Sequence, residues 1–576
     1  MKALISFIII GLSTFASFRI YQIKYSHQRA VLNVSLENDI DSMDPAKAFN
    51  DESLKLIGQV YETLYQYHYL KRPYEVIPLL ADGMPKISKN GLNYTIKIKQ
   101  GIQYHPHPAF KGKSRFVTSY DFVNQIKRLA FEPIKSTGSW LFKNRLIGFE
   151  EYSREVGNNF EKMLNTKLKG VETPDSTTLI LKFRRKETII LNFLTMNFIV
   201  PIPQEVIEFE ENNLDNKMIG TGPYFLDKIE KNKFFLIRYP QYRKDFYPSA
   251  GDRYANLKDL VSSSNEPIPF VDEIVFKVIE DSADRMRKFI EEELDFINIP
   301  KEFVDKFIIS FGKLPPEYQE KGVQLKHFTS VSSDWISFNM RDPIWGRNKN
   351  LRWAVAYAID YAKYVSLITN GANLRANSLY NPGIPGYDPR KKLPFHYDLE
   401  KAREYMRKAG YPEGQGLGEV TYSTRSDSGV HLLVGDFLKE QLGEIGIKVK
   451  VEVLKFSEFL RKGRAGELQL FLDRWIYDYP DAENLIQLLT TKNHPGINKS
   501  GYSNKEIDKL YEFYITTSNE EAKVKTMEKI EEIIHRDMPW IMLTYYSSYI
   551  LHHSNIKNYR KSSFIRNHLK YIKKVE

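Results

Sequence analysis

The stretch Leu468–Asn484 reads LQLFLDRWIYDYPDAEN and joins an apolar segment to a loop rich in aromatic and acidic residues. Its leucines alternate with other residues at Leu468, Leu470 and Leu472, which predicts a mostly buried strand. In open α/β sheets, ligands bind in the loops that follow the carboxyl ends of the strands. We therefore expect the loop after this strand to contribute to a ligand site.

Three residues after this strand are candidates for contacts with a ligand. Trp475 and Tyr477 offer aromatic faces, and Asp478 offers a carboxylate that looks unpaired. The alternative is that Trp475 packs in the core and that the acidic residues shape a turn around Pro480. This stretch alone leaves the two interpretations open.

A second stretch predicts a pair of parallel strands. Val420–Thr424 is strand-like, Gly429–Gly443 has apolar residues at helical spacing, and apolar and charged residues alternate over Ile447–Val453. Strand, helix and strand of this length form a right-handed crossover unit. Arg425 then lies at the carboxyl end of a strand. If the leucine-rich strand joins the same sheet, Arg425 and Asp478 face one cleft with opposite charges, which suits a zwitterionic ligand.

The composition is that of a globular protein with more than one core. A chain of 576 residues is too long for one ordinary core, so we expect two or three lobes. With 42% hydrophobic and 27% charged residues, the chain is not intrinsically disordered. The absence of cysteine excludes disulfides, thiolate metal sites, cysteine nucleophiles and lipid attachment at cysteine. The net charge of +11 is spread along the chain, as in many soluble proteins.

A leader is predicted over residues 1–18. Lys2 precedes an apolar run from Ala3 to Phe18 that has small residues near its end, as secretory signals do. The rival interpretation is an uncleaved anchor, because the run approaches the ~17 residues that a membrane-spanning helix needs. In either case we expect the rest of the chain to work in the periplasm, outside the cytoplasmic membrane.

Strand and helix patterns mix throughout the chain, which predicts the α/β class with several lobes. Leu32, Val34 and Leu36 alternate in a predicted strand over Val31–Glu37. Thr118 and Asp121 are placed to begin a helix that continues to Leu129. Further predicted elements are an amphipathic helix over Leu351–Ile359, a helix over Glu520–His535 and an aromatic strand over Trp540–Leu551.

Signatures of common enzymes are missing from the sequence. Neither a G-x-S-x-G elbow nor an H-E-x-x-H pair occurs, and His535-Arg536-Asp537 lacks the other kinase motifs. His105 and His107 flank a proline and have no further metal ligand close in sequence. We therefore expect no catalytic residue, no bound metal and no cofactor.

A series of short motifs follows in order between about Val31 and about Leu551: Asp41–Pro45, Val60–Leu64, Pro78–Asp82, Tyr94–Ile98, Thr118–Phe122, Gly220–Tyr224, Leu351–Asp360, Trp475–Asp481 and Asp537–Trp540. Together they resemble the large solute-binding proteins of oligopeptide and dipeptide ABC importers, known as solute-binding family 5. The resemblance implies a two-lobe periplasmic-binding-protein fold, with two crossing segments between the lobes and a ligand cleft at their junction. It places lobe one in residues 31–75, 205–300 and 535–576, an extra subdomain in 76–204, and lobe two in 301–534.

The resemblance also implies roles for individual residues. In peptide-binding members, an aspartate three residues after a tryptophan pairs with the α-ammonium of the peptide, and Trp475 and Asp478 have this spacing. In dipeptide binders an arginine just after a strand of the second lobe takes the carboxylate, and Arg425 fits that place. Asn50 and Asp51 would line the cleft from the first lobe.

By this resemblance the protein is a periplasmic receptor that captures peptides for an ABC importer. Its partners would be a peptide and the membrane permease subunits, with no nucleic acid, and the protein would be a monomer. One alternative keeps the fold and changes the solute to a nickel chelate, a cell-wall peptide, a sugar or an opine. A more distant alternative is a secreted hydrolase. Many relatives are anchored through a cysteine that this chain lacks, so we expect a free periplasmic protein or one held by its leader.

Overall fold

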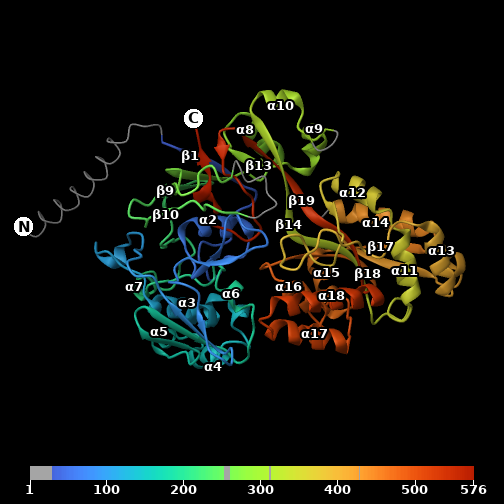
Figure 1. The fold of residues 1–576 in the computed structure, drawn as a ribbon, viewed down its shortest axis with the longest axis horizontal. Helices are drawn as coiled ribbons and strands as arrows, with labels where there is room; N and C mark the ends of the chain where they lie inside the picture. Colours follow the sequence, from blue (N-terminus) through green and yellow to red (C-terminus); the bar gives the residue numbers. More distant parts are fainter. Residues whose placement is uncertain (1–28, 252–259, 310–312, 427–428) are drawn as a thin grey trace, which may run out of the picture.

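The computed structural model describes residues 29–251, 260–309, 313–426 and 429–576. The predicted leader, residues 1–18, lies outside these residues. Figure 1 shows two large parts side by side, one drawn from blue to green and the other from yellow to red, with the long strands β14 and β19 passing between them. Within the described residues, no helix combines the length and the apolar character that crossing a membrane requires.

One large sheet of eleven strands runs through both parts. In spatial order its main path consists of β17 (Lys448–Leu454), β16 (Glu419–Arg425), β18 (Leu470–Ile476), β14 (Val323–Phe338), β19 (Trp540–His553), β13 (Phe296–Asn298), β1 (Val31–Leu36), β12 (Glu273–Val278), β9 (Lys233–Arg238) and β8 (Tyr224–Glu230). The short strand β15 (Leu374–Arg375) also pairs with β19. Strand β1 is the predicted one, with Leu32, Val34 and Leu36 on its buried face.

The two crossing strands are joined along most of their length. β14 and β19 pair antiparallel from Val323 opposite His553 to Ser337 opposite Trp540. The register shifts between Thr329 and Ser333, and such an irregularity bends a strand and increases its twist. On one side of this bend β19 pairs with β13, and on the other β14 pairs with β18. The bend therefore lies where the two halves of the sheet meet.

The predicted crossover unit is confirmed. β16, helix α14 (Gly429–Gly443) and β17 follow one another, and the two strands are parallel. β18 joins the same sheet parallel to β16, with Tyr422 opposite Leu470. One boundary is corrected, because β18 extends to Ile476 and so includes Trp475. Antiparallel pairing with β14 supplies backbone partners up to Ile476, and the loop begins only at Tyr477.

A separate antiparallel sheet lies within the range 76–204. Its strands, in spatial order, are β4 (Lys86–Ile87), β5 (Asn93–Lys97), β7 (Thr178–Lys182) and β6 (Val171–Asp175). The predicted helix begins beside it as α3 (Ser119–Ala130), where the Thr118 N–H donates to Asp121 at 2.8 Å. The division of the chain into lobes stays a prediction.

The range 76–204 also contacts the part of the chain that contains β18. The Thr188 N–H donates to the carbonyl of Ile515 at 2.9 Å. The Phe193 ring packs edge-on against Tyr479, with ring centroids 5.4 Å apart. The two large parts are thus held together by these contacts as well as by the crossing strands.

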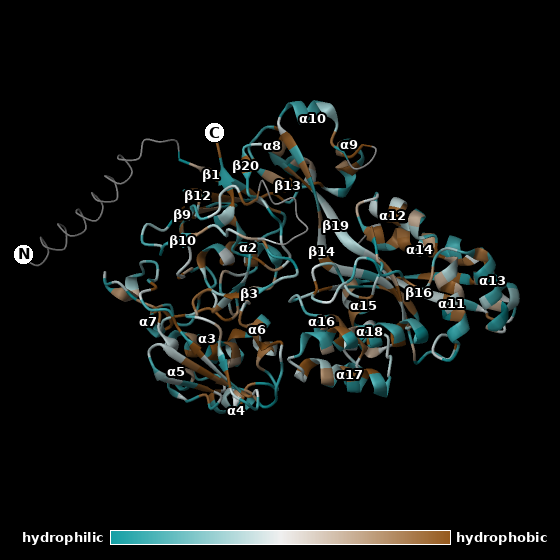
Figure 2. Ribbon diagram, in the orientation of Figure 1, coloured by the Kyte–Doolittle hydropathy of each residue, from teal (hydrophilic) through white to brown (hydrophobic). Residues whose placement is uncertain are grey.

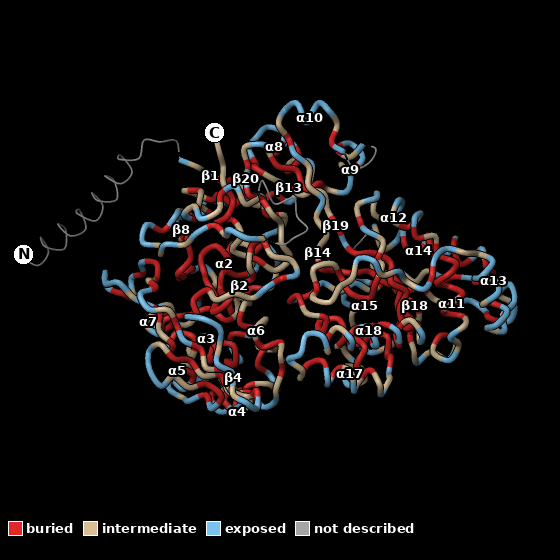
Figure 3. Tube along the Cα trace, viewed as in Figure 1, coloured by how far each residue is buried: buried red, intermediate tan, exposed pale blue. Residues whose placement is uncertain are grey.

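The remaining helices pack apolar faces inward, as the brown stripes of Figure 2 and the red segments of Figure 3 show. The predicted amphipathic helix is α11 (Lys349–Ala358), which buries Leu351, Ala354 and Val355 completely. The other helices are α2 (Asp51–Val60), α4 (Phe149–Val156), α5 (Phe160–Asn165), α6 (Ile190–Phe193), α7 (Gln204–Phe209), α8 (Ser282–Ile290), α9 (Val304–Phe307), α10 (Pro316–Glu320), α12 (Tyr361–Thr369), α13 (Leu399–Lys408), α15 (Phe456–Ala465), α16 (Glu483–Ile486), α17 (Lys505–Thr516) and α18 (Glu520–Asp537). Two-stranded ribbons are formed by β2 (Tyr65–Tyr67) with β3 (Val76–Pro78), β10 (Asp245–Phe246) with β11 (Pro267–Ile268), and β20 (Ile556–Lys557) with β21 (Lys573–Lys574).

Candidate binding site

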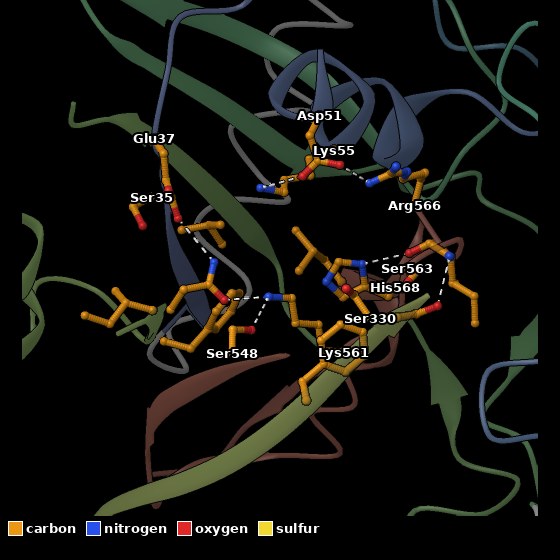
Figure 4. Close-up of a pocket in the computed structure, with 18 of the residues that line it drawn as sticks. Ser35, Glu37, Asp51, Lys55, Ser330, Ser548, Lys561, Ser563, Arg566 and His568 are labelled. Atoms are coloured by element: carbon orange, nitrogen blue, oxygen red, sulfur yellow. Dashed lines mark hydrogen bonds and ion pairs between the residues drawn. The ribbon is translucent and has the colours of Figure 1, made fainter. Parts of the chain in front are cut away.

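A cavity of about 400 Å³ lies where the crossing strands meet β1, the first turns of α2 and the chain between Tyr559 and Leu569. Figure 4 shows side chains from these segments pointing toward one another. Much of the wall is apolar and aromatic, including Phe296, Phe328 and Tyr546. Pockets for small ligands typically combine such walls with a few polar groups.

On the α2 side, the polar wall is an ion cluster centred on Asp51. Its carboxylate pairs with Lys55 at 3.0 Å and with the guanidinium of Arg566, as the dashed lines of Figure 4 show. Burial alone would raise the pKa of Asp51, but the charges of Arg566 and Lys55 hold it well below its ordinary value. Asp51 therefore lines the cavity as an ionised carboxylate whose charge is already compensated by two neighbouring cations.

On the other side, Arg474 of β18 lines the cavity and is tied to the bend in β14. Its guanidinium makes two hydrogen bonds to the carboxylate of Asp334, at 2.6 and 3.1 Å. Asp334 is 2% exposed, so the pair is largely desolvated at one end. The guanidinium also lies over the Tyr546 ring, 4.9 Å from its centroid. The two parallel hydrogen bonds fix the orientation of the guanidinium relative to Asp334.

Asp478 and Trp475 are brought together by a residue that sequence analysis did not single out, Asn484 in α16. The Asn484 side-chain oxygen accepts hydrogen bonds from the Trp475 indole at 2.8 Å and from the Asp478 backbone N–H at 3.1 Å. Its amide nitrogen donates to the Asp478 carboxylate at 3.3 Å. Because Asn484 is fully buried, it holds both side chains in fixed positions.

The carboxylate of Asp478 lacks a positive partner among the residues that the structure describes. Asp478 is exposed at the surface, but the protein packed around its carboxylate desolvates it enough to raise its pKa, and the hydrogen bond from Asn484 offsets only part of this effect. A raised pKa means that the charged form is poorly compensated where it lies. Asp478 follows two residues after Ile476, which lines the cavity, although Asp478 itself is not among the lining residues.

The other predicted site residues lie elsewhere. Tyr477 is buried on the core side, and its N–H donates to the carbonyl of Val331 at 3.1 Å. Arg425, at the end of β16, places its guanidinium 4.5 Å from the centroid of the Phe456 ring and does not line the cavity.

Asn50 has a structural role at the start of α2. Its side chain accepts a hydrogen bond from the Ser53 N–H and donates one to the carbonyl of Asp39, both at 2.8 Å. It therefore caps the helix that positions Asp51 and Lys55. Of the predicted residues, only Asp51 lies in the cavity wall. The structure brings Trp475 and Asp478 together, but these two residues, like Asn50, Tyr477 and Arg425, are not among the lining residues.

Several charged residues of the cavity were not predicted from the sequence. Lys55 had a visible signal, because it lies four residues after Asp51 on the same helix face. Arg566 and Lys561 had none, since they reach the cavity from a segment about 500 residues further along the chain. In the described part of the chain, no cluster of three or more histidine, aspartate or glutamate side chains is arranged to hold a metal.

Comparison with known proteins places this architecture in a family. The model of the middle part of the bacterial extracellular solute-binding proteins, family 5, matches residues 75–496. Heme-binding protein A of Haemophilus influenzae is 23% identical over 88% of this chain and 85% of its own length. The dipeptide-binding protein of Escherichia coli K12 is 22% identical over 86% of each chain.

Solved structures show the same fold. The periplasmic binding protein DppA of Helicobacter pylori, in complex with the peptide STSA, matches with a TM-score of 0.67 and 24% identity over 95% of this chain and 98% of its own. HbpA2 of Haemophilus parasuis matches with a TM-score of 0.76 over 95% of this chain and all of its own, at 20% identity. The predicted two-lobe periplasmic-binding-protein fold is thereby confirmed, and the chain belongs to family 5 of the bacterial extracellular solute-binding proteins.

Proposed function

We propose that this protein captures peptides in the periplasm and delivers them to the permease subunits of an ABC importer. Members of its family bind solutes outside the cell membrane, and its relatives include a dipeptide-binding protein. The observation that carries the proposal for this chain is Asp478, an exposed carboxylate beside the cavity that has no described cation to compensate it. A peptide supplies that cation as its α-ammonium.

The arrangement around Asp478 supports an anchor rather than a turn. A turn-forming aspartate usually directs its carboxylate to nearby backbone N–H groups. Here Asn484 performs that task by accepting from the Asp478 backbone N–H, which leaves the carboxylate with one amide donor. An ammonium would give this carboxylate the further, charge-assisted hydrogen bonds that it can accept.

The crossing strands supply the mechanism of capture in this proposal. Residues 31–75, 205–300 and 535–576 form lobe one with 76–204 as its extra subdomain, and residues 301–534 form lobe two. Bending at the irregular pairing between Thr329 and Ser333 would move Arg474 and Ile476 of β18 relative to the Asp51 side of the cavity. A ligand that contacts both lobes favours the closed population. The protein acts by binding alone, without a chemical step.

The ligands that the purified protein carries test this proposal. Protein isolated from its source should release peptides with free amino termini on mild denaturation, detected by mass spectrometry. Release of a solute without an α-amino group, such as a haem, a sugar or a nickel chelate, would contradict the peptide assignment while leaving the family intact.

A further inference from the structure

Lys561 differs from the other charged residues of the cavity in how it is paired. Its ammonium donates to the side-chain oxygen of Asn298 at 2.5 Å and makes a longer contact of 3.4 Å with the Ser548 hydroxyl (Figure 4). Both partners are neutral. No carboxylate of the described residues forms an ion pair with it, whereas Lys55 pairs with both Asp51 and Glu52.

The orientation of Asn298 confirms that Lys561 is held in place as a donor. The Asn298 amide nitrogen donates to Glu37 at 3.2 Å, so its oxygen is directed toward Lys561. Glu37 in turn lies 3.8 Å from the guanidinium of Arg285, so its charge has a cation of its own. An ammonium has three N–H donors, and the described residues occupy two of those of Lys561.

The surroundings make this uncompensated charge unfavourable. Burial lowers the pKa of Lys561 to about 8, and the positive charge of Lys55 adds to the shift. The negative charges of Asp51, Glu37 and Glu52 offset it only in part. The Phe328 ring lies 5.1 Å from the ammonium and is a weak partner compared with an anion.

We propose that Lys561 binds a carboxylate of the ligand, which makes it a specificity-determining residue of this cavity. The inference rests on the proposed function, since it assigns the anionic group of the same ligand. A carboxylate would accept the remaining donor and supply the missing negative charge in a partly desolvated place. Arg425, which the family resemblance favours for this role, stacks on Phe456 and does not line the cavity.

Two peptide libraries test the proposal and do not require the natural ligand to be identified first. Random tetrapeptides that lack Asp and Glu are prepared as C-terminal acids and as C-terminal amides, and ligand-stripped protein is exposed to an equimolar mixture. Mass spectrometry measures what is retained. We expect wild type to retain acids over amides by roughly 10- to 100-fold, the range for a hydrogen bond between charged groups. A third library, of amides that contain Asp or Glu, separates a C-terminal from a side-chain carboxylate.

Variants assign the preference to a residue. Lys561→Met should lose it and Lys561→Arg should keep it, while Lys557→Met, which replaces an exposed lysine four residues earlier that does not line this cavity, should also keep it. The proposal is overturned if Arg425→Met abolishes the preference and Lys561→Met does not, or if wild type retains all libraries equally. If Lys561→Met fails to fold, Lys561→Gln, which keeps a polar end without the charge, takes its place. If the protein retains none of the libraries, the proposed function is overturned as well. If it retains them all equally, only the proposal for Lys561 is overturned.

Discussion

The two acidic residues predicted for the site, Asp51 and Asp478, are in opposite electrostatic states. Asp51 lies between Lys55 and Arg566, and these charges lower its pKa. Asp478 receives one hydrogen bond from the neutral amide of Asn484, and partial desolvation of its carboxylate raises its pKa. An aspartate is therefore stabilised as an anion in the wall of the cavity, whereas another aspartate, in the loop beside the cavity, has a poorly compensated charge.

This difference determines which of the two carboxylates is available to a ligand. An ammonium that approached Asp51 would have to displace two cations that already satisfy it. At Asp478, which is exposed, it would replace only solvent and would supply the positive charge that the carboxylate lacks. We therefore expect ligand affinity to depend on Asp478 and the stability of the cavity wall to depend on Asp51.

The largest expected effect follows from removing the charge of Asp478. Asp478→Asn keeps the shape of the side chain but leaves the peptide ammonium without its anion. In the proposed closed form the lobes bury this ammonium pair, and breaking a buried ion pair typically costs ~3–5 kcal/mol, so affinity for peptides with a free amino terminus should fall by roughly 100-fold or more. Calorimetric titration with a peptide identified from the purified protein measures the change.

Two controls test whether the loss of affinity comes from the charge of Asp478. N-acetylated peptides lack the positive charge, so they should bind wild type weakly and lose much less affinity on substitution. Asp51→Asn should leave the affinity for free-amine peptides within a few-fold of wild type. Equal losses for free and acetylated peptides would instead make Asp478 a turn former, and unchanged affinity of Asp478→Asn would refute the ammonium anchor.

A smaller loss of affinity is expected when Asn484 is replaced, because Asn484 contacts no ligand in this proposal. Asn484→Ala removes the acceptor shared by the Trp475 indole and the Asp478 backbone N–H. Leaving buried donors unsatisfied costs ~1–3 kcal/mol each, mostly as lost stability. We expect affinity to fall about tenfold, because a mobile Asp478 binds an ammonium less well. The loss should be larger for free-amine than for acetylated peptides; equal losses would show that Asn484 only stabilises the loop.

The sequence predicted the elements of the fold well because their signals are local. Alternation in β1, the acidic start of α3 and the apolar stripe of α11 each depend on a few neighbouring residues. The end of β18 was misplaced, since its last residues, Trp475 and Ile476, are strand residues only through pairing with β14. The parallel strands at one end of the large sheet could be predicted from the pattern of β16, α14 and β17. The bend in the crossing strands has no signal in the sequence of either strand alone.

The site was predicted only in part, because charge compensation is not local. Asp51 and Asp478 look alike in the sequence, and both precede or follow aromatic and acidic residues. Arg566, which distinguishes them, lies more than 500 residues from Asp51 along the chain. Asn484 lies only six residues from Asp478, but its bridging role requires the turn that brings α16 back to the end of β18.

The smallest expected effect concerns the stability that Asp51 contributes. Its side chain is 54% exposed, so its ion pairs with Lys55 and Arg566 are partly screened by solvent. Exposed pairs are worth ~0.2–1 kcal/mol each, and Asp51→Asn should therefore lower the free energy of unfolding by only about 1 kcal/mol at pH 7. The folded-state pKa of Asp51 lies below its unfolded value of about 3.9, so this contribution is fully present above that pH. It is lost as the pH falls through the folded-state pKa, because both states then bind the proton.

Thermal denaturation of wild type and Asp51→Asn should thus differ by a degree or two between pH 5 and 8 and converge in acid. A difference that persists undiminished at the lowest pH where the protein stays folded would mean that the charge of Asp51 is not the source of the stability, and the contrast with Asp478 would then rest on the ligand alone.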